Sequence, residues 1–270
     1  MVATIGELRR KTFEEPIPMV GPWLREQNLC MIHSWRGTGK TFFALGLAQA
    51  VASGSPFLKW FTQESHVFYF DCEMGERALM IRFNLLDASA KYPASHSSLR
   101  FLTYQHMGGF TWNLTEKANL DRLTALIEPC KLIIIDNLSA AVRPLKGEDF
   151  KTAYNRFRDW MLMIRTSGRS IVLIHHSGKE GKQRGISDIE DPLDVVIQLK
   201  RPEDWKPENG TQFDIIFEKG RELEALDQVT VPVDLVTENE KLVWRWGDSA
   251  IRQKPEEKKN WRKNNDEDLF

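Results

Sequence analysis

The chain has 270 residues, of which 41% are hydrophobic and 28% charged, and its formal net charge is −1. This composition is ordinary for a globular protein of one large or two small domains. No run of about 18 apolar residues occurs, which excludes a membrane-spanning helix, and the N-terminus lacks the features of a signal peptide. The near-zero net charge neither favours nor excludes nucleic-acid binding, because a basic groove can lie on a neutral protein.

Three cysteines, an odd number, stand at wide spacing along the chain: Cys30, Cys72 and Cys130. Each lies in or beside an apolar segment that has the pattern of a buried strand. We therefore expect reduced core thiols rather than a disulfide or a metal site. This usage is typical of a cytoplasmic protein.

Short apolar runs alternate with longer helical stretches over most of the chain. Strand patterns occupy residues 29–33, 66–71, 99–103, 131–136 and 170–175. Helical patterns occupy residues 40–53, 75–86, 116–127 and 150–166. Strands that alternate with helices form mainly parallel sheets covered on both faces. The order therefore predicts an α/β fold with a mainly parallel central sheet flanked by helices.

The pattern changes after residue 190. Four further strand patterns follow without a long helix between them, at residues 195–199, 212–218, 229–235 and 242–246. They predict an antiparallel extension of the same sheet on its C-terminal side, not a second domain. We accordingly expect three parts. These are an N-terminal arm (1–20), a single core domain (21–248) and a charged, disordered tail (249–270).

A glycine-containing loop, residues 34–41, connects the first predicted strand to the first helix. A phosphate-binding loop has Gly, four residues, Gly-Lys, then Ser or Thr; here only the first Gly is replaced, by Ser34. The backbone N–H groups and the helix N-terminus favour phosphate, Lys40 adds charge, and the Thr41 hydroxyl suits Mg²⁺. We predict ATP and Mg²⁺ as ligands, with GTP left open because no base-recognition motif is evident. The predicted nucleotide-binding residues are Ser34, Gly37, Thr38, Gly39, Lys40, Thr41 and Phe42.

Two acidic residues at strand ends extend this predicted site. Asp136 ends the most apolar strand, about 95 residues after the loop, and an acid there suits Mg²⁺ held through water. Glu73 follows the neighbouring strand, where a carboxylate can reach a water over the γ-phosphate. We predict Glu73 as the general base. The alternative is that Asp71 and Glu73 are solvated loop acids.

The combination of motifs resembles the RecA-like ATPase superfamily. The resemblance depends on the phosphate loop, residues 70–73, Asp136 and the histidine pair at 175–176. It is most similar to the plasmid-type RepA hexameric replicative helicases and related mobile-element ATPases, some of which also carry Ser at the first loop position. The segment 183–199 resembles that group as well, and the likeness covers about residues 20–245.

The resemblance implies roles for several residues in catalysis. Glu73 would be the catalytic base, and one of His175 and His176 would sense the γ-phosphate, with His176 preferred. Lys219 and Arg221, one residue apart after a predicted strand, would reach into the ATP site of a neighbouring subunit. Positive charge there stabilises the transferring phosphoryl group. The protein would then act as a homo-oligomer, and we expect a hexamer; a solvated strand end is the alternative for this pair.

The same family geometry places contacts with single-stranded DNA in two loops. The candidate DNA-binding residues in these loops are Arg143, Lys146, Lys179, Lys182 and Arg184. Basic, glycine-containing loops suit phosphate-backbone contact without sequence reading. Neither loop offers an obvious aromatic residue for base stacking, which weakens the DNA interpretation.

We therefore expect an oligomeric, DNA-stimulated ATPase, a ring-shaped replicative helicase of a plasmid, phage or mobile element, with no membrane partner. Two alternatives stay open. The first is a regulatory or assembly ATPase whose nucleotide state controls a partner protein. The second is a recombination mediator that forms filaments on DNA. The acidic C-terminal tip, residues 266–270 with Leu269 and Phe270, resembles docking tips of replication proteins, although a solvated tail is the simpler interpretation.

Overall fold

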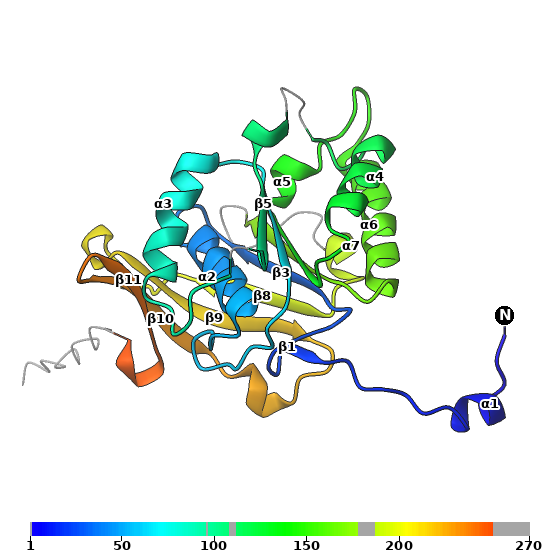
Figure 1. Ribbon diagram of the computed structural model, residues 1–270, viewed down its shortest axis with the longest axis horizontal. Helices are drawn as coiled ribbons and strands as arrows, with labels where there is room; N and C mark the ends of the chain where they lie inside the picture. Colours follow the sequence, from blue (N-terminus) through cyan, green and yellow to red (C-terminus); the bar gives the residue numbers. More distant parts are fainter. Residues whose placement is uncertain (1, 96, 108–111, 178–186, 251–270) are drawn as a thin grey trace, which may run out of the picture.

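The structure is a computed structural model, and it describes residues 2–95, 97–107, 112–177 and 187–250. A sheet of nine strands forms its centre (Figure 1). In spatial order the strands are β11 (Lys241–Trp246), β10 (Val231–Glu238), β9 (Thr211–Gly220), β8 (Val195–Lys200), β3 (Leu29–Ser34), β7 (Ser170–His176), β6 (Leu132–Asp136), β4 (Val67–Asp71) and β5 (Leu99–Leu102).

The six strands from β8 to β5 are parallel, and β9, β10 and β11 continue the sheet in antiparallel pairing. This arrangement confirms the predicted parallel sheet and its antiparallel extension. Strands β3, β4 and β6 are buried at every position. Their apolar runs, with polar residues only at the C-terminal ends of the strands, follow from this position, because strands covered on both faces do not alternate with polar residues.

Helices cover both faces of the sheet (Figure 1). One face carries α2 (Lys40–Ser53) and α3 (Glu76–Asp87), and the other carries α4 (Lys117–Leu126), α5 (Leu138–Ala141), α6 (Phe150–Thr166) and α7 (Ser187–Glu190). Each face has its own hydrophobic core. Successive residues of a strand point to opposite faces, so Ile32 packs in the α2 core and Met31 in the α6 core.

The N-terminal segment lies outside these layers at first and joins them before β3. Helix α1 (Ile5–Arg9) projects away from the body (Figure 1). Strand β1 (Pro18–Val20) then pairs with β2 (Leu24–Arg25), and Met19 and Val20 are buried in the α2 core. Short 3₁₀ turns complete the chain at Tyr104–Met107, Pro207–Asn209, Ala225–Gln228 and Gly247–Ser249. In the described ranges, no helix has both the length and the apolar character needed to cross a bilayer.

Candidate nucleotide-binding site

The phosphate loop lies where β3 ends and α2 begins, at the carboxyl edge of the parallel strands. This edge is where open α/β sheets bind ligands. Gly39 has φ +117°, and a Cβ atom there would lie 2.6 Å from Cγ2 of Thr211. Glycine is therefore required at this position both by the backbone angle and by the close approach of β9.

A cavity of about 300 Å³ opens beside the loop. Its walls come from α2 and from the ends of β4, β6, β7 and β9, so the fold gathers predicted residues that are far apart in the sequence. The lining residues are Gly37, Gly39, Lys40, Thr41, Phe42, Asp71, Glu73, Met74, Arg82, Asp136, His176 and Thr211. Of the other predicted loop residues, Thr38 is buried, and its hydroxyl donates to the carbonyl of Trp35 at 2.9 Å.

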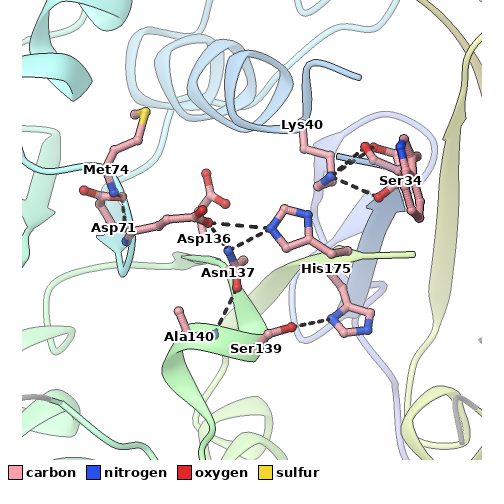
Figure 2. Close-up of polar contacts among 12 residues, drawn as sticks. Ser34, Lys40, Asp71, Met74, Asp136, Asn137, Ser139, Ala140 and His175 are labelled. Atoms are coloured by element: carbon pink, nitrogen blue, oxygen red, sulfur yellow. Dashed lines mark hydrogen bonds and ion pairs between the residues drawn. The ribbon is translucent and has the colours of Figure 1, made fainter. Parts of the chain in front are cut away.

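Lys40 is the buried cation of the cavity. Its Nζ donates to the carbonyl of Ser34 at 3.0 Å, to Oγ of Ser34 at 3.2 Å and to the carbonyl of Trp35 at 3.1 Å. Figure 2 shows Lys40 turned toward Ser34, across the site from Asp136. Burial lowers the pKa of Lys40 to about 8, although the Asp136 and Glu73 carboxylates partly oppose this shift. Ser34 thus holds the lysine head group that the sequence assigns to phosphate.

Asp136 is a buried carboxylate at the end of β6. It accepts a hydrogen bond from the Tyr69 hydroxyl at 2.7 Å and another from the Thr41 side chain. Burial raises the pKa of Asp136 to about 6, the nearby Asp71 and Glu73 charges add to the shift, and the two hydrogen bonds oppose it. The two hydrogen bonds therefore compensate only part of the negative charge that Asp136, Asp71 and Glu73 place together.

The residues present fit Mg²⁺. The Thr41 hydroxyl and the Asp136 carboxylate supply oxygen atoms, the donor type that Mg²⁺ prefers. Across the described residues, no group of three acidic, histidine or cysteine side chains is placed to hold a metal. Mg²⁺ takes its remaining positions from waters and substrate phosphates rather than from a protein cage.

Asp71 shapes the turn that carries Glu73. It is 2% exposed and accepts from the backbone N–H groups of Glu73 at 3.2 Å, Met74 at 2.9 Å and Gly75 at 2.8 Å. Asp71 is therefore not a solvated loop acid. Sequence reasoning missed this role, because an acid at a strand end gives no indication of which backbone groups it will accept from.

Glu73, Asn137 and His176 form a polar chain at the mouth of the cavity. Nδ2 of Asn137 donates to Oε2 of Glu73 and lies 3.1 Å from Nε2 of His176. Nε2 of His176 lies 3.6 Å from the same Glu73 oxygen. Burial lowers the pKa of His176, with Lys40 adding to the shift and Glu73 opposing it. A neutral His176 can accept from Asn137, so the amide joins the candidate base to the candidate sensor.

Asn137 was not predicted, yet the sequence holds a signal for it. The signal is an asparagine directly after Asp136, where the next helix starts: its side chain caps α5 by accepting from the N–H of Ala140 at 3.0 Å.

His175 points to the other face of the sheet, where its Nδ1 lies 3.5 Å from Oγ of Ser139 (Figure 2). Burial lowers the pKa of His175 to about 4. Position therefore favours His176, which lines the cavity, over His175.

Lys219 and Arg221 do not line the cavity of their own chain. Nζ of Lys219 donates to the carbonyl of Glu190 at 2.6 Å, and the Arg221 guanidinium donates to the carbonyl of Asp191 at 2.7 Å. The guanidinium also pairs with Asp194 at 3.5 Å. Both cations therefore lie together beside α7, at the end of β9 opposite to Thr211.

The candidate DNA-binding residues are only partly described. Arg143 and Lys146 are exposed in the segment between α5 and α6. Lys179, Lys182 and Arg184 lie outside the described residues, as does the C-terminal tip at 266–270. The structure thus places one of the two predicted basic loops, beside the helix that Asn137 caps.

Two arginine side chains near the loop were not predicted. Arg201, just after β8, donates to the carbonyl of Gly37, and its guanidinium lies 3.9 Å from the ring centroid of Trp205. Arg82 on α3 lies over the ring of Phe42 at 5.1 Å. The sequence alone could not indicate these contacts, because they depend on how β8 and α3 pack against the loop.

Comparison with known proteins identifies the family. No curated protein sequence matches the chain. A KaiC-like protein from the hyperthermophilic archaeon Pyrococcus horikoshii OT3 is similar in structure, with a TM-score of 0.59 and 14% identity over 87% of this chain and 99% of that one. A second solved structure, an ATPase domain, is similar as well, with a TM-score of 0.58 and 16% identity over 80% of this chain and 84% of that one. The AAA domain family matches residues 4–182. The chain belongs to the AAA domain family and has the fold of a RecA-like P-loop ATPase, as its motifs predict.

Proposed function

We propose that the protein is an oligomeric ATPase stimulated by single-stranded DNA, a ring-shaped replicative helicase of a plasmid, phage or mobile element. One observation carries the proposal. The cavity brings Lys40, Glu73 and Asp136 together with the polar link from Glu73 to His176, while Lys219 and Arg221 lie outside it. This arrangement supports a site that is complete only when a second subunit contributes to it.

ATP hydrolysis requires positioning and charge stabilisation more than covalent help from the protein. Lys40 and the loop N–H groups would bind the phosphates. Glu73, whose carboxylate is held in place by the Asn137 amide, would orient the attacking water. Mg²⁺, held by Thr41 and through water by Asp136, would neutralise phosphate charge. The Glu73 side chain is 62% exposed, so a neighbouring subunit would be needed to shield it and the attacking water from bulk solvent.

The position of Lys219 and Arg221 supports action in trans. Both lie on the α7 face of the sheet and bind carbonyl groups there. Cations that stabilise a transferring phosphoryl group must approach its oxygens closely. In their own subunit these two cannot line the cavity without a large shift, so a neighbour's cavity is the better target.

The polar chain also supports coupling to DNA. Asn137 contacts Glu73 with its amide and caps α5 with its carbonyl oxygen. The exposed Arg143 and Lys146 follow that helix by a few residues. A strand of DNA bound on these cations would therefore contact the segment after α5, the helix whose N-cap residue, Asn137, holds the candidate base.

Purified protein should hydrolyse ATP, single-stranded DNA should raise the rate, and a forked duplex should be unwound. The Glu73→Gln variant should bind ATP and lose turnover. If ATP is hydrolysed but DNA neither raises the rate nor is unwound, the helicase proposal fails. A Glu76→Gln variant, altered at an exposed acid on the same turn, is the matched control and should keep turnover.

Action in trans has its own experiment. Arg221→Ala subunits keep their catalytic acids, and Glu73→Gln subunits keep their cations. Each protein alone should be inactive, whereas a mixture should recover activity at interfaces where an intact site meets an intact Arg221. No recovery at any mixing ratio would exclude action in trans.

A filament-forming recombination mediator is the second candidate, and one observation favours it. The projecting arm exposes Ile5, Phe13 and Ile17, which are 66%, 70% and 51% exposed. An apolar segment that projects from the body suits packing on another subunit. Negative-stain images with ATP and single-stranded DNA would separate closed rings from filaments.

A further inference from the structure

Buried His33 connects the phosphate loop to the end of β7 and to the end of β9, where Lys219 lies. Its Nδ1 lies 2.8 Å from Oγ of Ser177, and its Nε2 lies 2.7 Å from Oε2 of Glu218. His33 is 3% exposed and directly precedes Ser34 of the phosphate loop. Ser177 follows β7, and Glu218 directly precedes Lys219. A carboxylate accepts, so the Nε2 proton of His33 is directed at Glu218.

The strand register explains why this histidine reaches Glu218. Residues of β3 alternate between the two faces, and His33 points to the α6 face, as Met31 does. The pairing of β8 with β9 shifts at one position, where Val196 pairs with Lys219 and Ile197 with Phe217. Glu218 is the extra residue of this bulge, a device that re-aims side chains in a sheet.

A second contact connects His33 to the nucleotide site. The Ser34 carbonyl accepts from Nζ of Lys40 at 3.0 Å and from the N–H of Ser177 at 2.9 Å. Lys40 can bind a phosphate only by weakening its bonds to Ser34 and Trp35. Nucleotide binding therefore changes the bonding of the carbonyl that links Ser34 to Ser177, one residue from His33.

We propose that His33 is a positioning residue that couples the nucleotide site of a subunit to Lys219 and Arg221 of the same subunit, through the hydrogen bonds to Ser177 and Glu218. The chain of contacts then runs from Lys40 to Ser34 and Ser177, and from His33 to Glu218. Each subunit presents its two cations to the neighbour according to its own nucleotide state. The inference rests on the proposed action of these cations in trans.

A purely structural role makes a different prediction. If the cluster only satisfies buried polar groups, breaking it weakens the fold wherever it is broken. A positioning role is directional, because Glu218 acts on the cations of its own subunit and these serve only the neighbour's site. The distinction can be measured in mixtures where one subunit type supplies the site and the other supplies Arg221.

The experiment places Glu218→Ala in one subunit type at a time. Subunits with Glu73→Gln supply cations, and subunits with Arg221→Ala supply working sites. Glu218→Ala in the cation-supplying subunits should lower kcat of the mixture roughly 10- to 100-fold, the scale of a small misplacement of a catalytic group. The same change in the site-supplying subunits should leave kcat and KM within about twofold.

Two further variants control for folding. Glu218→Gln keeps an acceptor for His33 and should restore most of the rate in the cation-supplying subunits. Glu222→Ala, which removes an exposed carboxylate at the same end of β9, should have no effect in either position. Equal loss in both positions, or no loss in either, would overturn the inference while leaving action in trans intact. If the mixture of Arg221→Ala and Glu73→Gln subunits shows no activity without any change at Glu218, the proposed action in trans fails, and this inference fails with it.

Discussion

The Tyr69 hydroxyl donates a hydrogen bond to Oδ2 of Asp136 at 2.7 Å, at the buried end of β6 beside the phosphate loop. This bond opposes the rise in the Asp136 pKa that burial causes. We predict that Tyr69→Phe raises the pKa of Asp136 above its present value of about 6. A protonated Asp136 cannot hold Mg²⁺ through water, so activity is present above this pKa and lost as pH falls through it. The acid limb of the kcat profile should therefore move to higher pH.

Steady-state ATPase rates across the acid limb and up to mildly alkaline pH, at saturating Mg²⁺ and ATP, measure this shift. Tyr154→Phe is the matched control, because Tyr154 is also buried and donates to the carbonyl of Ile189 at 3.1 Å, away from the cavity. Both variants should lose about 1–3 kcal/mol of unfolding free energy. An acid limb that moves equally in both variants, or in neither, would contradict the assigned role of Tyr69.

The Asn137 amide leads to a prediction about catalysis. We predict that Asn137→Ser lowers kcat about 10- to 100-fold, because serine is too short to hold Glu73 and contact His176. The affinity for nucleotide should change little, because Asn137 does not line the cavity. Serine is also a good N-cap, so α5 should keep its first turn. Single-turnover hydrolysis together with equilibrium binding of a non-hydrolysable analogue separates the two effects.

The control is Asn119→Ser, which alters a buried asparagine of α4 whose amide donates to the carbonyl of Asn113 at 3.1 Å. This variant should lose stability without losing kcat. If Asn137→Ser instead weakens nucleotide binding and leaves the bound rate unchanged, Asn137 does not position the candidate base.

A residue's place in the site can be predicted from the sequence when it depends only on the strand that the residue ends. Asp136 and the turn after Asp71 end apolar runs, and the carboxyl ends of parallel strands meet at one edge of the sheet. The sequence alone therefore predicts that Asp136 and Glu73 lie near the phosphate loop. The ranges predicted for α2 and α6, about 40–53 and 150–166, coincide with those of the structure. Residues at the ends of these helices give local signals: Gly39 and Gly54 flank α2, and Asp149 is the N-cap of α6.

Contacts between side chains that depend on packing cannot be predicted in this way. The approach of Thr211 to Gly39 and of Arg201 to Gly37 depends on how β8 and β9 return along the sheet. The placement of Glu218 beside His33 depends on a one-residue bulge. Such bulges carry no periodic signal, so sequence patterns indicate the strand and miss the contact.

The burial of Lys40 predicts how nucleotide affinity depends on pH. The pKa of Lys40 in the nucleotide-free protein is about 8, and phosphate binding raises it. Affinity is thus fully present below this pKa and declines as pH rises through it. We expect binding about tenfold weaker at about pH 9 than at about pH 7, measured by titration calorimetry of an ATP analogue. Lys40→Arg stays charged across this range and should show a flat profile. An equally flat profile for the wild type would contradict the lowered pKa.

The contact between Gly39 and Thr211 predicts a coupled pair of substitutions. Gly39→Ala would combine a positive φ with a Cβ 2.6 Å from Cγ2 of Thr211, so it should cost about 2–5 kcal/mol of stability and abolish nucleotide binding. Thr211→Ala alone should be mild. In the double variant the clash with Cγ2 of Thr211 disappears, whereas the backbone strain and a 3.3 Å contact with Cε1 of Phe213 stay, so the two costs should not add. Urea unfolding of the wild type, both single variants and the double variant gives this interaction energy directly. Strict additivity would mean that β9 does not press on the loop, and that Gly39 is required for its backbone angle alone.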